Sequence, residues 1–209
     1  MPKNKENPSK RKAQAGAKSQ KANGIKSRQR VRDLGEVFTQ EREVNNILAL
    51  TQATSNRYWR FLEPACGNGN FLEAILRQRL DHLKQDRIEW HAKNREFSVL
   101  KVLSTIYGVD IVEDNISECK KRLRGVIFDY LPKKTSKEFL FAMEEIMDTN
   151  LIVGDMINGV DKIFFTEYST PARGFFKRRV YALTDMELGI ETVIKEYPTV
   201  SYKEMAHGK

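Results

Sequence analysis

The stretch Phe61-Leu-Glu-Pro-Ala-Cys-Gly-Asn-Gly-Asn-Phe-Leu72 joins a short β-prone run to a glycine turn and then to an apolar pattern with helical spacing. Glycines at positions 67 and 69 let the backbone approach a ligand closely. The first N–H groups of the following helix are free to bind an anionic or polar group. The stretch therefore predicts the strand, turn and helix of an α/β unit, with a ligand site where the strand ends.

Two later runs repeat the pattern of a short strand that ends in an acid. They are Ile106-Tyr-Gly-Val-Asp110 and Leu151-Ile-Val-Gly-Asp155, and segments with apolar residues at helical spacing separate all three strands. Right-handed crossovers bring the carboxyl ends of such strands to one edge. We therefore expect a doubly wound, mostly parallel α/β sheet with Glu63, Asp110 and Asp155 together at its ligand-binding edge.

The chain after residue 156 has a different pattern. Two β-prone runs, 162–168 and 175–183, flank a turn that contains proline and glycine, which predicts an antiparallel hairpin. Thr184 and Glu187 form a capping-box pattern that opens a short helix. We expect a disordered basic arm over 1–32, a folded domain over 33–183, and a helix with a frayed tail over 184–209.

The net charge of +8 belongs to the N-terminal arm. Residues 1–32 hold 11 Lys or Arg and one acid, whereas the other 177 residues hold 25 basic and 27 acidic side chains. An arm this polar cannot bury enough apolar surface to become ordered alone. Its basic clusters predict salt-sensitive contact with the phosphates of DNA or RNA, and a purely solubilising arm is the alternative. The residues expected to make these contacts are Lys10, Arg11, Lys12, Arg28, Arg30 and Arg32.

Composition and spacing disfavour several other classes of protein. No apolar run is long enough to cross a bilayer, no signal peptide is recognisable, and we expect a cytoplasmic protein without membrane contact. The two cysteines and three dispersed histidines form no metal-binding or disulfide pattern, so no metal is expected. A dinucleotide site would need a third glycine at position 72, which is Leu, and an acid about 20 residues further on.

The stretch 61–72 resembles motif I of the class I DNA methyltransferases that use S-adenosylmethionine to modify the N6 amine of adenine. Other motifs follow in the order of that family. Gly35-Glu-Val-Phe-Thr39 is similar to motif X, Gly108-Val-Asp110-Ile111 to motif II, and Gly154-Asp155-Met156 to motif III. The resemblance covers roughly residues 33–156 and implies a Rossmann-like methyltransferase fold, truncated after motif III, from a restriction-modification or phage-related system.

The resemblance also implies roles for individual residues. Glu63 would contact the ammonium of the methionine group, Asp110 would accept the ribose hydroxyls, and Asp155 would accept the adenine amine. The complete set of expected S-adenosylmethionine contacts is Phe38, Thr39, Glu63, Ala65, Cys66, Gly67, Gly69, Phe71, Asp110, Ile111, Asp155 and Met156.

The sequence departs from this family where the family carries its catalytic residues. Adenine-amine methyltransferases have Asn, Asp or Ser followed by Pro-Pro and an aromatic residue, and this chain contains no Pro-Pro. In the expected place, Glu167 and Tyr168 are the candidates for an amine acceptor and a stacking ring. Two alternatives stay open: a non-catalytic cofactor-binding or DNA-binding subunit that needs a partner for target recognition, and a methyltransferase acting on RNA.

Overall fold

The computed structural model describes residues 39–51, 55–132, 134–187 and 192–205. Phe38 and the basic arm 1–32, for which binding roles are predicted, lie outside these residues. In chain order the elements are α2 (Glu41–Thr51), β1 (Phe61–Glu63), α3 (Asn70–Gln85), α4 (Arg95–Leu103), β2 (Ile106–Asp110), α5 (Glu113–Tyr130), α6 (Lys137–Asn150), β3 (Leu151–Val153), η1 (Val160–Lys162), β4 (Phe164–Ser169), β5 (Phe175–Ala182), α7 (Leu183–Glu187), β6 (Lys195–Glu196) and β7 (Val200–Ser201).

The three expected strands form a parallel sheet in the order β1-β2-β3. Glu63 pairs with Gly108 at the end of β1, and Asp110 pairs with Val153 at the end of β2. The strands therefore end at one edge, as the sequence predicts. No described helix is both long and apolar enough to cross a bilayer.

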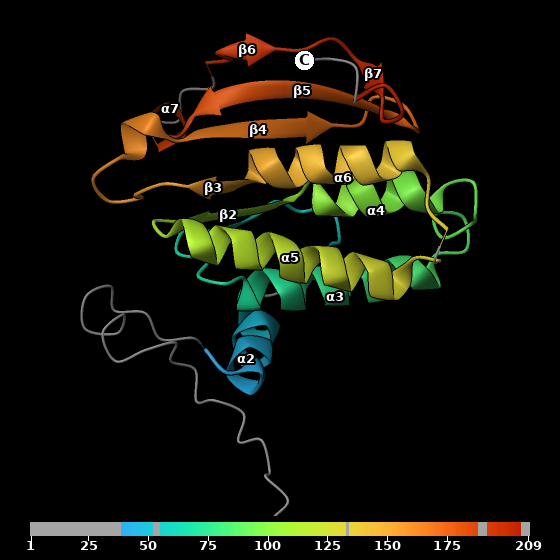
Figure 1. The fold of residues 1–209 in the computed structure, drawn as a ribbon, viewed down its shortest axis with the longest axis horizontal. Coiled ribbons are helices and arrows are strands. Elements are labelled where there is room, and N and C mark those ends of the chain that lie inside the picture. The colour runs from blue at the N-terminus through green and yellow to red at the C-terminus, as the bar shows by residue number, and fades with distance from the viewer. Residues whose placement is uncertain (1–38, 52–54, 133, 188–191, 206–209) are drawn as a thin grey trace, which may run out of the picture.

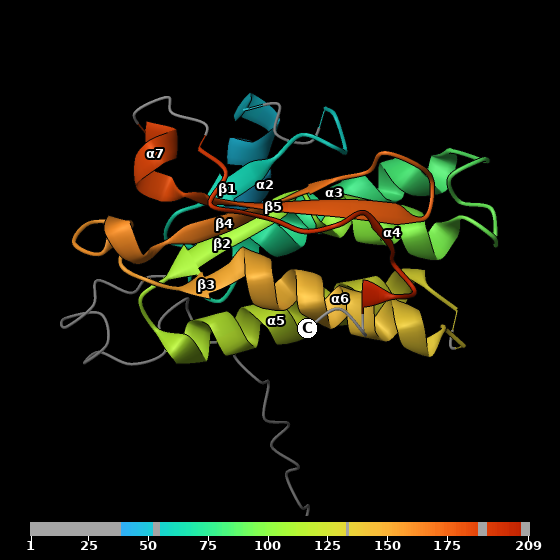
Figure 2. The same ribbon diagram turned by 90° about the horizontal axis from the view of Figure 1, so that it is seen from above.

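The parallel sheet is covered by helices on one face and by an antiparallel sheet on the other (Figure 1). On the helical face, a Cβ on Gly108 would lie 2.7 Å from Leu72 of α3, so the strand and this helix pack closely. On the other face, the Tyr107 hydroxyl donates to the Thr166 carbonyl of β4 at 2.9 Å. Three layers result, and Figure 2 shows β4 lying over β2, with β3 to one side.

The described strands show the expected α/β class with a parallel sheet, and the doubly wound arrangement stays a prediction. Their order follows the chain without the reversal that brings helices to both faces of such a sheet. The physical reason lies after β3, where the chain makes only the short turn η1 before β4 and provides no crossover helix. The architecture shown is α/β, with a three-stranded parallel sheet and a separate antiparallel sheet.

The predicted hairpin is present, and the C-terminal segment packs more closely than expected. Strands β4 and β5 pair antiparallel from Phe164–Ala182 to Ser169–Lys177. Both β6 and β7 then pair with β5, so the segment 195–201 extends the antiparallel sheet. Tyr202 and Met205 are buried, which corrects the expectation of a frayed end: these apolar side chains complete the main core.

Side chains decide where several elements begin. Ser136 accepts a hydrogen bond from the Phe139 N–H at 3.1 Å and caps α6. Helix α2 starts at Glu41, two residues after Thr39. The apolar residues just before Phe61 stay outside the first strand, because Asn56 accepts a hydrogen bond from the Tyr58 N–H and holds a turn there.

Candidate functional site

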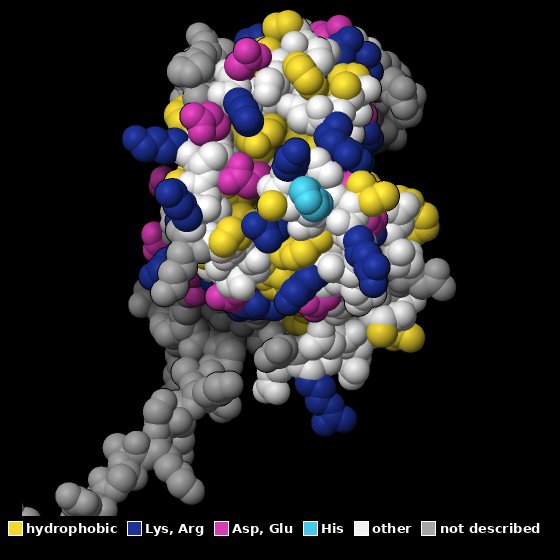
Figure 3. Space-filling model, turned by 90° about the vertical axis from the view of Figure 1, so that its right-hand side faces the viewer, with side chains coloured by type: hydrophobic (Ala, Val, Ile, Leu, Met, Phe, Trp, Pro, Cys, Tyr) yellow, Lys and Arg dark blue, Asp and Glu magenta, His cyan; other side chains and the backbone are white. Residues whose placement is uncertain are grey.

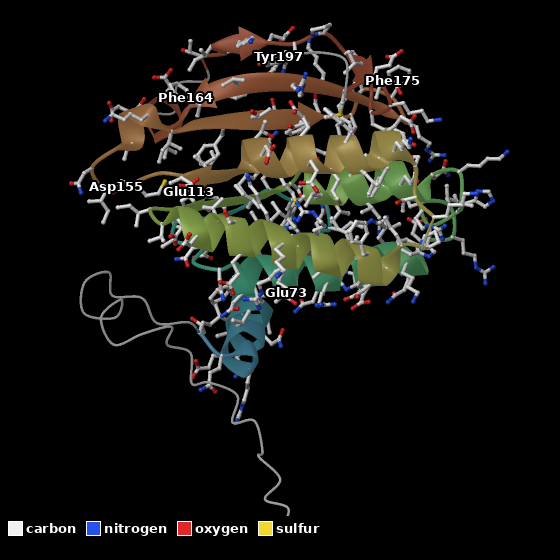
Figure 4. The ribbon with its side chains drawn as sticks, viewed as in Figure 1. Glu73, Glu113, Asp155, Phe164, Phe175 and Tyr197 are labelled. Carbon is white, nitrogen blue, oxygen red and sulfur yellow. The ribbon has the colours of Figure 1, made fainter. Side chains whose placement is uncertain are left out.

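A cavity of about 770 Å³ lies where the three parallel strands end. Figure 4 shows Asp155 at this end of the molecule, near Glu113 at the start of α5. The expected cofactor contacts that line the cavity are Thr39, Glu63, Ala65, Cys66, Gly67, Phe71, Asp110, Ile111, Asp155 and Met156. Gly69 lies behind the lining, at the N-terminus of α3. The structure thus brings together residues from four separate stretches of the sequence.

The glycine turn is shaped by backbone conformation and by close packing against α5. Gly67 has φ 52° and Gly69 has φ 86°, in the left-handed region where a Cβ is unfavourable. A Cβ on Gly69 would also overlap the Sγ atom of Cys119. The turn is closed by a hydrogen bond from the Gly69 N–H to the Cys66 carbonyl at 2.9 Å. Position 69 therefore requires glycine for two independent reasons.

The Asp110 carboxylate is held by three donors of the protein itself. Its Oδ2 accepts from the Gly67 N–H at 2.9 Å, and its Oδ1 accepts from the Val112 N–H at 2.9 Å and from Asn115 Nδ2 at 3.1 Å. A carboxylate offers about four acceptor positions, so roughly one is left for a ligand. Asp110 thus fixes the glycine turn against β2 and leaves room for one ligand hydroxyl.

Asp155 is similarly engaged by the chain that follows it. Its Oδ1 accepts from the backbone N–H groups of Ile157 and Asn158 at 2.8 and 3.0 Å, and its Oδ2 accepts from Asn158 Nδ2. The Asn158 N–H, followed by that of Ile157, lowers the pKa of the Asp155 carboxyl below its usual value. Asp155 is therefore a charged acceptor at neutral pH.

Glu63 differs from the other two strand-end acids because no described residue gives its carboxylate a hydrogen bond or an ion pair. The side chain is partly buried in the cavity wall, and this burial raises the pKa of the carboxyl. A desolvated carboxylate without a partner is costly unless something positive binds to it. The cavity therefore contains one acid that is arranged for a cationic group.

Asn68 supplies a second polar group without a partner inside the cavity wall. Its side chain is 9% exposed, and its Nδ2 donates to Glu118 at 3.1 Å. Its Oδ1 is buried and has no hydrogen-bond partner. Buried polar atoms are usually paired, so this oxygen marks an acceptor position next to the glycine turn. The acceptor would suit a ligand that carries N–H or O–H groups.

Helix α5 holds the glycine turn through Arg122. Its guanidinium donates to Glu73 at 2.7 Å, to the Asn70 side chain at 2.5 Å and more weakly to the Asn68 carbonyl at 3.4 Å. Asn70 in turn donates to the Thr39 carbonyl at 2.9 Å, which brings the segment before α2 to the cavity. Sequence reasoning missed Arg122 and Asn70. Asn70 stands inside the quoted motif, whereas Arg122 lies on a helix face without a distinguishing signal.

Apolar side chains are exposed at the rim of the same cavity. Ile111 is 60% exposed and Ile157 is 85% exposed, and Met156 lines the wall between the strand ends. Exposed isoleucines next to a cavity with strand-end acids provide flat contact for an aromatic ring. Ile157 was not predicted, although it directly follows the recognised motif.

The two candidate catalytic residues lie away from this cavity. Tyr168 is buried in the main core, where its hydroxyl lies 2.6 Å from the Thr149 hydroxyl and its ring packs edge-on against Phe176. Glu167 forms an ion pair with Arg60 in a second cavity of about 310 Å³. The alternation of β4 buries Tyr168 and leaves Glu167 partly exposed. Neither residue is therefore placed to accept or stack a base at the strand ends.

Metal and thiol chemistry find no support among the remaining described residues. No group of His, Cys, Asp and Glu among them is arranged to hold a metal ion. Cys66 and Cys119 are buried free thiols, and a hydrogen bond with Cys119 and burial raise the pKa of Cys66. The opposite end of the molecule carries Lys and Arg interspersed with acidic and apolar side chains, without one continuous patch (Figure 3). Comparisons with family models, curated proteins and solved structures found no match to this chain.

Proposed function

We propose that this chain is an S-adenosylmethionine-dependent methyltransferase domain of the class I, Rossmann-like type, acting on the N6 amine of adenine in DNA. The observation that carries the proposal is the partly buried Glu63 carboxylate, which has no partner among the described residues and shares one cavity with Asp110 and Asp155. S-adenosylmethionine supplies a methyl group activated by a positively charged sulfur. Its amino acid part carries an ammonium, which is the kind of group that Glu63 lacks as a partner.

The residues of the cavity fit the other parts of this cofactor. Asp110 keeps about one free acceptor position for a ribose hydroxyl, and Asp155 keeps about one for an amine. Ile111 and Met156 offer apolar surface to the adenine ring, and the unpaired Asn68 Oδ1 accepts a polar hydrogen. The cavity volume of about 770 Å³ lies within the range of ligand pockets.

The nucleic acid part of the proposal rests on the sequence. The basic arm would bind phosphates without sequence preference, and DNA is the substrate implied by the order of the motifs. Methyl transfer to an amine also needs acceptors for its N–H groups as positive charge develops. The acceptor side chains that line the cavity are the strand-end acids, Asn68, Asn70, Asn115 and Thr39, whereas the two candidate catalytic residues, Glu167 and Tyr168, lie elsewhere.

This last point favours a second candidate function. The chain would bind the cofactor and DNA but would depend on a partner subunit for the catalytic acceptor and for target recognition. The specific support is the position of Tyr168 inside the core and of Glu167 in another cavity. A methyltransferase acting on RNA has no separate structural support.

Calorimetric titration tests the cofactor proposal first. We expect saturable one-to-one binding of S-adenosylmethionine with a dissociation constant below about 1 mM, and binding of S-adenosylhomocysteine as well, because the product keeps the ammonium that Glu63 would contact. Gly67→Trp should abolish binding, because its side chain would occupy the cavity. No binding by the wild-type chain would refute both candidate functions.

Transfer of a radioactive methyl group then separates the two candidates. Wild-type protein is incubated with labelled cofactor and DNA, with RNA in parallel and with no nucleic acid as the control. Label in DNA adenine supports the methyltransferase. Cofactor binding without transfer would reject independent catalysis and favour the partner-dependent subunit.

A further inference from the structure

The second cavity, of about 310 Å³, lies between the parallel sheet and the antiparallel sheet. Its walls come from β1, β2, β4, β5 and the start of α7, and none of its lining residues lines the cavity at the strand ends. Leu62 lines this cavity and Glu63, the next residue of β1, lines the other. Successive residues of a strand point to opposite faces, so β1 separates two different sites.

The interior of this second cavity is apolar and rigid. Tyr107 and Phe165 are almost fully buried, and their rings pack edge-on with centroids 5.7 Å apart. The Tyr107 hydroxyl is already bonded to the Thr166 carbonyl, so the ring is fixed in place. Leu62, which is 38% exposed, and Leu183 complete the apolar walls. Among these four residues Leu62 exposes the largest fraction, so a flat aromatic group would lie mainly against Leu62, with smaller contacts to Tyr107 and Phe165.

The mouth of the cavity carries two guanidinium groups with donors to spare. Arg60 contacts Glu167, and its side chain is 60% exposed. Arg179 donates its Nε to Glu196 at 2.7 Å, while its Nη1 is 4.0 Å from Glu167, beyond hydrogen-bond distance. A guanidinium has five N–H donors, so each arginine keeps donors that no described acceptor uses. The two guanidinium groups approach different oxygens of Glu167, and their remaining donors suit a phosphate.

The one acid in the cavity is not available to a ligand cation. Glu167 contacts Arg60 and accepts a hydrogen bond from the Tyr181 hydroxyl at 3.1 Å. Its charge is balanced by Arg60, and Glu196 pairs with both Arg179 and Lys177, so these three cations and two acids leave a net charge of about +1 at the mouth. What the cavity offers to a ligand is an apolar aromatic slot with cationic donors at its entrance.

We propose that this second cavity binds a nucleoside monophosphate unit, with the base against Leu62, Tyr107 and Phe165 and the phosphate at Arg60 and Arg179. The unit can come from a free nucleotide or from an unpaired nucleotide of a strand. The proposal does not depend on the cofactor cavity, because the two sites share no lining residue. It gives the antiparallel sheet a binding role that neither candidate function includes.

The experiment uses calorimetry on the full chain with four probes. They are adenosine monophosphate, adenosine, ribose 5-phosphate and a short single-stranded oligonucleotide. We expect adenosine monophosphate to bind at least about tenfold more tightly than either fragment, because a charge-assisted phosphate contact contributes about 1.5–3 kcal/mol. Equal affinity for adenosine monophosphate and ribose 5-phosphate would refute the aromatic slot.

Variants assign the binding to this cavity. Arg60→Gln and Arg179→Gln should each weaken adenosine monophosphate binding about tenfold and leave adenosine binding nearly unchanged. Leu62→Trp should block both. Arg124→Gln is the matched control, because this arginine pairs with Glu144 on the far side of the molecule. Unchanged nucleotide binding in the three cavity variants would overturn the proposal.

Two further readouts make each outcome decisive. Thermal melting shows whether a variant is folded, and S-adenosylmethionine titration of the same samples separates a failure of this site from a failure of the proposed function. If the cavity variants lose binding of both the oligonucleotide and adenosine monophosphate, the nucleotide that binds here comes from a strand. If the cavity variants lose binding of adenosine monophosphate but keep binding of the oligonucleotide, the ligand is a free nucleotide.

Discussion

Replacing Glu63 by Gln should stabilise the free protein and weaken its binding of a cationic ligand. The substitution keeps the shape of the side chain and removes a charge that burial disfavours. Burial raises the pKa of Glu63, so the folded state holds the proton more tightly than the unfolded state does. The stability of the wild type therefore falls as pH rises from the ordinary value of 4.5 through the raised pKa. Above the raised pKa, the unfavourable free energy of burying the charged Glu63 carboxylate is fully present.

The size of both effects follows from the surroundings of the carboxylate. The side chain is only partly buried, so we expect a gain of no more than about 1 kcal/mol at pH 7, or about 2–4 °C in melting temperature. Losing one charge-assisted contact costs about 1.5–3 kcal/mol of binding, or about 10- to 150-fold in the dissociation constant for S-adenosylmethionine. Affinity and stability should therefore change in opposite directions.

The measurements are calorimetric titration at pH 7 and thermal melting at two pH values. At about pH 4, below the window, the two proteins should melt at nearly the same temperature, because Glu63 is then largely protonated in both states. Glu113→Gln is the control, since Glu113 is an exposed acid at the same end of the molecule and lies outside the cavity. A Glu63→Gln variant that is less stable at pH 7, or that binds the cofactor as well as wild type, would refute the reasoning.

Three other changes test the frame of the cavity and the arm. Gly69→Ala should lower the free energy of unfolding by about 2–4 kcal/mol, because alanine disfavours the left-handed backbone and its Cβ would overlap Cys119. Adding Cys119→Ala to the same chain should recover part of this loss in denaturant titrations. If the effects of the two substitutions are simply additive, the overlap is contradicted. Arg122→Gln should weaken cofactor binding about tenfold and speed hydrogen exchange of the glycine turn, whereas Arg124→Gln, on the same helix, should do neither; equal effects would reject the positioning role. Deleting residues 1–32 should flatten the salt dependence of DNA binding, and an unchanged slope would rule out the arm as the phosphate contact.

Sequence alone predicted the features that depend on neighbouring residues. Strands ending in Glu63, Asp110 and Asp155 were visible as short β-prone runs before helical patterns, and parallel pairing brought the three acids to one cavity. The hairpin was equally clear, because a glycine-containing turn separates its two apolar runs. These predictions needed only local patterns and one topological rule.

Features that depend on packing between distant elements were missed. The alternation of β4 says that Glu167 and Tyr168 point to opposite sides, but it does not say that α6 covers the side of Tyr168. Arg122 reaches the glycine turn across the contact between α3 and α5, which no sequence spacing indicates. The path of the chain after β3, which brings an antiparallel sheet against the second face, was likewise not indicated by any local pattern.

The three strand-end acids divide their tasks according to the hydrogen bonds they already make. Asp110 and Asp155 are each held by three protein donors, so their charges are largely used to fix the turn and the loop around the cavity. Glu63 has no such donors among the described residues. Discrimination between a cationic and a neutral ligand therefore has to come mainly from Glu63, whereas the other two acids set the shape into which the ligand fits. The same logic predicts that Asp110→Asn would disturb the glycine turn itself, which makes Glu63 the informative position for testing charge recognition.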